Sequence, residues 1–264
     1  MRRLHLIELE DHPWCPAPVR DAATDYLQFG IEQLQPYRVI AGRLRAALER
    51  TGSQQVLDLC SGGGGPWKKL WSQLDNPALS VTLSDRFPNR IALQWLQRTS
   101  GGRLRFIEEP VDATHVPRHV TGFRTLFTAF HHFAPDAAAQ IVSDAVSAGE
   151  GVGIFEVTER RVGAALWMLL VPLVILVITP FVRPFRWSRL FWTYVIPAVS
   201  FVGLWDGVVS CLRSYTTHEL REIAHAAGGD YDWSVGVEPV PRSFLRVTYL
   251  IGVPRTAAAE REAR

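Results

Sequence analysis

The chain has 264 residues, 47% of them hydrophobic and 20% charged, which predicts a folded core and excludes a disordered chain. It carries 28 Lys and Arg against 26 Asp and Glu, and the net charge of +2 is too small for a nucleic-acid-binding surface. Its three cysteines, Cys15, Cys60 and Cys211, lie too far apart in sequence for a zinc site or a disulfide framework, so no metal is expected.

The first fifty residues are expected to be mostly helical. An apolar stretch near the N-terminus is interrupted by Glu8, Glu10 and Asp11, so no secretion signal is predicted and the chain is expected to stay in the cytoplasm. Apolar residues then recur at helical spacing from residue 19 to residue 50. We interpret residues 1–50 as one helical unit.

Strands and helices alternate in the next hundred residues. Strands are expected at residues 55–59, 81–85, 104–107, 125–130 and 151–157, and helices at 67–74, 91–97 and 136–148. This alternation predicts parallel βαβ units and therefore an α/β fold with a doubly wound sheet. Two more strands, at 233–240 and 245–253, are close enough in sequence to form a hairpin. The core is thus assigned to residues 51–161 and 213–254, and residues 255–264 to a tail.

A glycine-rich loop follows the first strand directly, in the segment VLDLCSGGGGPW that begins at Val56. Backbone N–H groups at such a loop can bind a ligand at the start of the next helix, but no Lys-Ser/Thr pair follows, so this is no Walker loop. Asp58, just before the loop, would repel a pyrophosphate and favours a cationic ligand instead. Asp85, at the end of the second strand, can accept both hydroxyls of a ribose.

In these motifs the chain resembles the class I S-adenosylmethionine-dependent methyltransferases. Their first motif, acid-x-Gly-x-Gly-x-Gly, matches residues 58–64, with Cys60 in place of the first glycine. The resemblance covers residues 50–160 and 215–254. It implies a seven-stranded sheet that is parallel except for an antiparallel last strand, and a lid over the methyl acceptor formed by residues 1–50.

The resemblance further implies S-adenosylmethionine as the cofactor. Asp58 and Gly62 would hold its aminoacyl end, Asp85 its ribose and the Asp112-Ala113 pair its adenine. The residues expected to bind the cofactor are Asp58, Cys60, Ser61, Gly62, Gly64, Asp85, Arg86, Asp112, Ala113 and Phe130.

Candidate catalytic residues follow the fourth and fifth strands. His131 and His132 lie in the segment after the fourth strand, and Glu156 lies at the end of the fifth. An imidazole titrates near neutral pH and can accept a proton from the acceptor. The alternative is that one histidine packs against the cofactor while the other is solvated, because alignment alone supplies much of the acceleration of methyl transfer.

An apolar insertion at residues 162–212 interrupts the core. It contains a charge-free run at 162–182 and a second apolar segment at 190–212, each long enough for a transmembrane helix. Because the closing hairpin must rejoin the sheet, the insertion crosses a membrane twice or not at all. The favoured interpretation is a helical hairpin that enters one leaflet; a two-span transmembrane helix pair and an apolar cap or homodimer face are the alternatives.

Together these patterns predict a methyltransferase that acts on a small, lipophilic acceptor at the cytoplasmic face of a membrane. The alternative is a membrane-associated protein that binds a nucleoside ligand without catalysis. An NAD-dependent oxidoreductase is disfavoured by Asp58.

Overall fold

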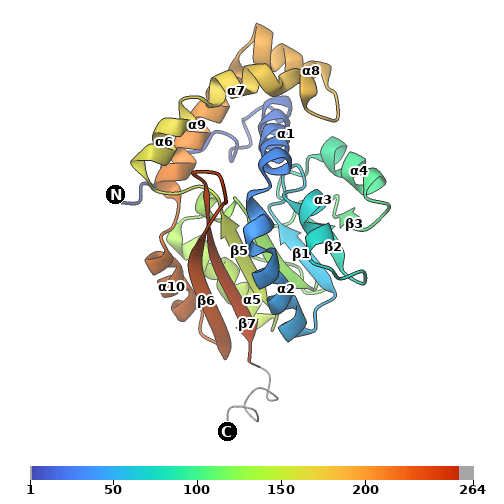
Figure 1. The fold of residues 1–264 in the computed structure, drawn as a ribbon, viewed down its shortest axis with the longest axis vertical. Helices are drawn as coiled ribbons and strands as arrows, with labels where there is room; N and C mark the ends of the chain where they lie inside the picture. The colour runs from blue at the N-terminus through green and yellow to red at the C-terminus, as the bar shows by residue number, and fades with distance from the viewer. Residues whose placement is uncertain (1, 256–264) are drawn as a thin grey trace.

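The computed structural model describes residues 2–255, so most of the tail expected at 255–264 lies outside the described residues. Seven strands form one sheet in the order β3-β2-β1-β4-β5-β7-β6 (Figure 1). Their bounds are Gln55–Leu59 (β1), Ser80–Leu83 (β2), Leu104–Phe106 (β3), Phe123–Phe127 (β4), Val152–Glu156 (β5), Tyr231–Pro239 (β6) and Arg246–Pro254 (β7). Strand β7 pairs antiparallel with both β5 and β6, while β1 to β5 are parallel. The expected sheet and its closing hairpin are therefore confirmed.

Two strands end earlier than the sequence pattern predicted. β4 stops at Phe127 because Thr128 adopts a left-handed φ of 48°, which turns the chain away from the sheet. β2 stops at Leu83, which leaves Asp85 in the loop beyond the strand.

Helices cover both faces of the sheet. One apolar cluster joins the strands to α2 (Ala41–Thr51), α3 (Trp67–Leu70) and α4 (Arg90–Thr99). The other joins them to α5 (Pro135–Ser147) and α10 (Thr217–Ala226). In β1, Val56 belongs to the first cluster and Leu57 to the second, as expected where successive side chains point to opposite faces. Short helical turns at Pro36–Ile40, Trp71–Gln73 and Phe130–His132 complete these connections.

The insertion does not form the expected long helical hairpin. It consists of α6 (Val162–Met168), α7 (Val171–Ile178), α8 (Trp187–Leu190) and α9 (Ala198–Arg213), with short turns at Thr179–Phe181 and Phe191–Val195. Prolines explain the breaks: Pro172 opens α7, Pro180 lies in the turn after it, and Pro197 precedes α9. Among residues 2–255, no single helix is both long enough and apolar enough to span a bilayer. Two pairs of consecutive helical segments in the insertion would meet both criteria if each pair were counted as one helix, but the pairs are bent by 41° and 80°.

A third apolar cluster attaches the insertion to α1 (Ala17–Leu34), which rises from the sheet towards α7 and α8 in Figure 1. Its core joins Val19 and Tyr26 of α1 to Ile175 of α7 and Val199 of α9. The phenol of Tyr26 hydrogen-bonds the hydroxyls of two threonines in the insertion. Within residues 2–50, a non-helical segment precedes α1, and α2 packs on the sheet.

Candidate functional site

The loop after β1 is shaped by left-handed backbone conformations. Cys60, Gly62 and Gly64 have φ values of 56°, 52° and 117°. A Cβ on Gly64 would lie 2.4 Å from the Leu96 side chain, so this position accepts only glycine. Cys60 therefore holds the conformation that glycine adopts more easily, at the position where the resemblance expects a glycine.

Asp58 lies beneath this loop. It is buried, and its carboxylate accepts hydrogen bonds from the hydroxyls of Thr125 at 2.6 Å and Ser61 at 2.7 Å. Burial raises the pKa of the Asp58 carboxyl to about 6, and these hydrogen bonds limit the rise. In this arrangement Asp58 holds the loop in place through Ser61.

Asp85 lies on the other side of the loop and connects it to β2. Its carboxylate accepts the Gly62 N–H at 2.7 Å and the Phe87 N–H at 2.8 Å. Gly62, Asp85 and Arg86 all line a cavity of about 430 Å³, which we call the glycine-loop cavity. Its other walls are the N-terminal segment, α1 and the residues after β4.

The expected cofactor residues divide into two groups. Cys60, Ser61, Gly62, Asp85 and Arg86 line the glycine-loop cavity. The others lie behind the loop or away from the cavity: Asp58, Gly64, Asp112, Ala113 and Phe130.

Two of the expected cofactor residues outside the cavity, Asp112 and Phe130, contact neighbouring parts of the protein. Asp112 is exposed and accepts hydrogen bonds from the backbone and hydroxyl of Thr114, which hold its pKa below the usual value. Phe130 is fully buried against the ring of Tyr215.

His131 and Glu156 form a buried pair. The imidazole Nδ1 of His131 lies 2.6 Å from Glu156 Oε2, and the other carboxylate oxygen accepts the N–H groups of Ala129 and Phe130. Burial alone would raise the pKa of Glu156, but the neighbouring His131 and these donors lower it overall. Glu156 thus positions His131 and the turn that carries both histidines.

His132 is held by acidic residues from the N-terminal segment. Its Nδ1 lies 2.6 Å from Glu8 Oε2 and 2.7 Å from Asp11 Oδ1. Burial would lower the pKa of His132, but these two carboxylates raise it well above its usual value. Arg213 also contacts both acids and donates to the His132 carbonyl. His131 is buried, whereas the His132 side chain is 20% exposed and lines the glycine-loop cavity.

The same cluster has the composition of a metal site. Single ligand atoms of Glu8, His131 and His132 lie within 4.8 Å of one another. Arg213 already places a positive charge beside Glu8. That this part of the protein holds no metal stays a prediction.

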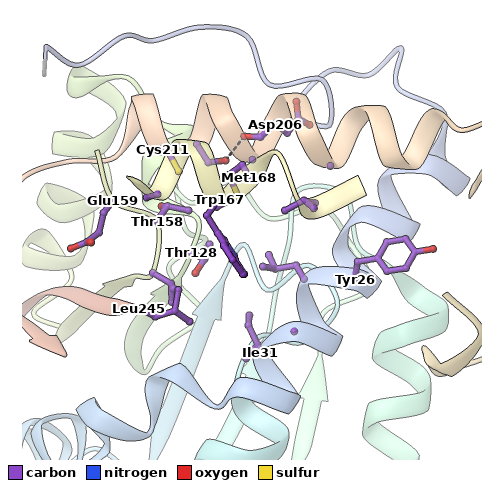
Figure 2. A pocket seen from close by; sticks show the side chains of 18 of the residues that line it. Tyr26, Ile31, Thr128, Thr158, Glu159, Trp167, Met168, Asp206, Cys211 and Leu245 are labelled. Atoms are coloured by element: carbon purple, nitrogen blue, oxygen red, sulfur yellow. Dashed lines mark hydrogen bonds between the residues drawn. The ribbon is translucent and has the colours of Figure 1, made fainter. Parts of the chain in front are cut away.

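A second cavity, of about 530 Å³, adjoins the first; we call it the apolar chamber. Its walls come from α1, α6, α7, α9 and the β6–β7 connection, and Figure 2 shows Trp167 pointing into it between Leu245 and Ile31. Glu10, Leu27, Ile31, Thr128 and His132 line both cavities. The two cavities therefore meet at His132.

Sequence reasoning missed the contribution of the N-terminal segment. The Asp206 carboxylate accepts the backbone N–H groups of Leu9 and Glu10 at 2.7 and 3.1 Å, which fixes this segment along α9. Burial raises the pKa of the Asp206 carboxyl to about 6 and that of the Glu10 carboxyl to about 8. The available signal was the concentration of acids at residues 8–11 in an otherwise apolar stretch.

No protein-family model matches the chain, and no curated protein sequence matches it. Solved structures do resemble it. A putative O-methyltransferase from Nostoc punctiforme superposes with a TM-score of 0.53 at 15% identity, covering 90% of this chain and 61% of that one. An O-methyltransferase family 2 protein from Planctomyces limnophilus, in complex with apigenin, gives 0.51 at 16% identity, covering 89% and 62%.

Human N-acetylserotonin methyltransferase, in complex with S-adenosylmethionine, gives a TM-score of 0.50 at 13% identity and covers 87% of this chain and 56% of its own. The chain thus spans about three fifths of the length of these structures. The likeness shows that the chain has the fold of class I methyltransferases.

Proposed function

We propose that the protein is an S-adenosylmethionine-dependent methyltransferase that methylates a hydroxyl group of a small, apolar acceptor. The observation that carries this proposal is the junction of the two cavities at His132. One cavity lies at the glycine loop and the other is lined mainly by apolar side chains, so a methyl donor and an apolar acceptor would meet at a titratable group. The O-methyltransferases among the structural neighbours support oxygen as the atom methylated.

The glycine-loop cavity suits S-adenosylmethionine in size, shape and charge. Its volume of about 430 Å³ lies within the range of small-molecule sites. Asp85 lies at the wall of this cavity and offers a carboxylate for the ribose hydroxyls, and its bond from the Gly62 N–H fixes that carboxylate beside the loop. The acids Glu8 and Asp11 also line this cavity, and their negative charges would stabilise the positive sulfonium.

His132 is the residue that we assign as the general base. When bound, S-adenosylmethionine supplies an electrophilic methyl group, which leaves sulfur as it bonds to the acceptor oxygen. The neutral form of His132, with its one proton on Nδ1 facing Glu8 and Asp11, would accept the hydroxyl proton on Nε2. These carboxylates stabilise the imidazolium that results. His131 and Glu156 position the turn, and the apolar chamber excludes water from the acceptor.

The test is turnover of labelled S-adenosylmethionine with a panel of apolar alcohols, phenols and lipid extracts. We expect a labelled methyl ether and one equivalent of S-adenosylhomocysteine. Calorimetric titration with S-adenosylmethionine and with NADH, on the same sample, checks the cofactor. Binding of S-adenosylmethionine without product from any acceptor would favour a nucleoside-binding protein, whereas NADH binding alone would overturn the cofactor assignment.

A further inference from the structure

The outer face of the insertion is an apolar surface without a partner in the described part of the chain. Most of the large apolar side chains that are exposed among residues 2–255 lie between residues 162 and 205. Representative members are Leu166, Leu169, Leu173, Val177, Trp187 and Phe201, with exposures from 57% to 78%. Patches of this kind mark sites of interaction with proteins or membranes.

The charge of this surface points to lipid as its partner. Residues 162–205 contain no Asp, Glu or Lys. Of their three arginines, Arg186 and Arg189 are turned inward and paired with acids of α1, which leaves Arg183 as the exposed charge. The exposed indole of Trp187 lies four residues from Arg183, a combination typical of the boundary between lipid headgroups and acyl chains.

The geometry of α7 also favours lipid over a flat protein contact. Ile175 is its one buried residue, and the exposed apolar side chains of Val174 and Leu176, two positions apart in the helix, leave it on roughly opposite sides. A protein partner covers one face of a helix, whereas a helix that is apolar around its circumference needs an apolar medium on its remaining sides. Helices lying in the membrane interface have that environment.

The apolar chamber opens on the same surface. Trp167 and Val174 line the chamber, yet they are 46% and 47% exposed. The Trp167 indole packs edge-on against Phe244 of the β6–β7 connection, with ring centres 4.7 Å apart. Because Trp167, Val174 and Phe244 both line the chamber and are exposed, the chamber reaches the outer surface at these residues.

We infer that the outer face of residues 162–205 binds the surface of a lipid bilayer as a monotopic anchor, and that the apolar chamber takes its ligand directly from the lipid phase. The first part, binding of the protein to the bilayer surface, follows from the apolar outer face alone. The second step rests on the proposed function, because it makes the methyl acceptor a membrane-dissolved compound with a hydroxyl group near an extended apolar body.

The experiment is flotation of the purified full chain with phosphatidylcholine vesicles, with and without phosphatidylglycerol. We expect binding to both, strengthened by the anionic lipid because of Arg183. Leu173→Glu and Val177→Glu should each weaken binding about tenfold or more, since neither side chain lines the chamber and each loses its burial in lipid. Ile91→Glu, at an equally exposed apolar position on α4, is the matched control and should bind as wild type.

Absence of vesicle binding by the wild type, or equal binding by all four proteins, would overturn the inference. A wild-type dimer that the Leu173 and Val177 variants dissociate, measured by analytical ultracentrifugation, would assign the surface to a second copy instead. Titration of the same preparations with S-adenosylmethionine separates the two proposals, because cofactor binding without vesicle binding would reject the membrane anchor and leave the methyltransferase assignment intact.

Discussion

Arg189 of the insertion donates from Nη2 to Oδ2 of Asp25 on α1 at 2.8 Å, and both side chains are almost completely buried. Burial raises the pKa of Asp25 and lowers that of Arg189, so each charge depends on the other for its stability in the interior. This pair fixes α8 of the insertion to α1, and α1 supplies one wall of the apolar chamber.

Asp25→Ala should lower the free energy of unfolding by about 3–5 kcal/mol, because it leaves the Arg189 guanidinium buried without its counter-charge. Urea unfolding measures the loss. Glu238→Ala, which breaks an exposed pair with Arg43, is the control and should cost about 0–1 kcal/mol. The double replacement Asp25→Leu with Arg189→Leu should recover much of the loss; no recovery would mean that the ion pair is not the cause.

Asp85→Asn should weaken binding of S-adenosylmethionine about 10- to 100-fold. The change removes a charged acceptor for the ribose and weakens the support of the loop through Gly62. Asp112→Asn serves as the comparison, because Asp112 is exposed and its hydrogen bonds go to Thr114. Calorimetry on both variants decides which acid holds the cofactor: an effect at Asp112 as large as that at Asp85 would contradict the geometry described above.

His132→Gln should reduce kcat by about 10²- to 10⁴-fold, as expected for loss of a general base, with little change in cofactor affinity. His218→Gln, on the exposed side of α10, is the control. Glu8→Gln should move the acidic limb of the kcat profile to lower pH, because one of the carboxylates that raise the pKa of His132 is gone. An unchanged limb in this variant would exclude His132 as the titrating base.

The stability of the ligand-free protein should decrease as the pH rises from about 5 to 8. Unfolded Asp and Glu titrate near pH 4, whereas in the folded protein the pKa of Asp206 is about 6 and that of Glu10 about 8. The folded state therefore holds more protons across this window, and the free energy of unfolding falls with pH. The raised pKa of His132 acts in the same direction, since its stabilisation is complete below about 6.5 and disappears as the pH passes the folded value.

Urea unfolding at pH 5, 6.5 and 8 checks this trend. Glu10→Gln mimics the protonated acid at every pH, so its stability should fall less steeply between pH 6.5 and 8. A slope as steep as that of the wild type would show that Glu10 does not titrate in this range.

The sequence was sufficient to predict the sheet and the glycine loop, because buried strands and the loops between them follow local patterns. It placed Asp85 at the end of β2, although that strand ends at Leu83. It was not sufficient for the N-terminal segment. Glu8 lies in a segment without helical or strand periodicity, so the sequence pattern does not predict where its side chain points. Its contact with His132 depends on Asp206, which binds the neighbouring backbone. The inward-facing arginines were also missed, since nothing in the apolar insertion reveals that Arg189 has its partner on α1.

A proline interrupts a helix, but its position in the sequence does not give the direction in which the chain then turns. Pro172 and Pro197 turn the helices back over α1, where the ion pairs and the third apolar cluster hold them. Tertiary contacts therefore decided the path of the insertion.

Cys60 provides a test of the loop that does not depend on activity. Its φ of 56° costs a non-glycine residue about 1–2 kcal/mol, whereas glycine adds only about 0.5–1 kcal/mol of unfolded-chain entropy. Cys60→Gly should therefore stabilise the protein by up to about 1 kcal/mol in urea and keep its affinity for S-adenosylmethionine. Cys60→Ala removes the thiol but keeps the strain, so it should show no such gain. Equal stabilities of the two variants would mean that the thiol, and not the backbone conformation, determines the energy at this position.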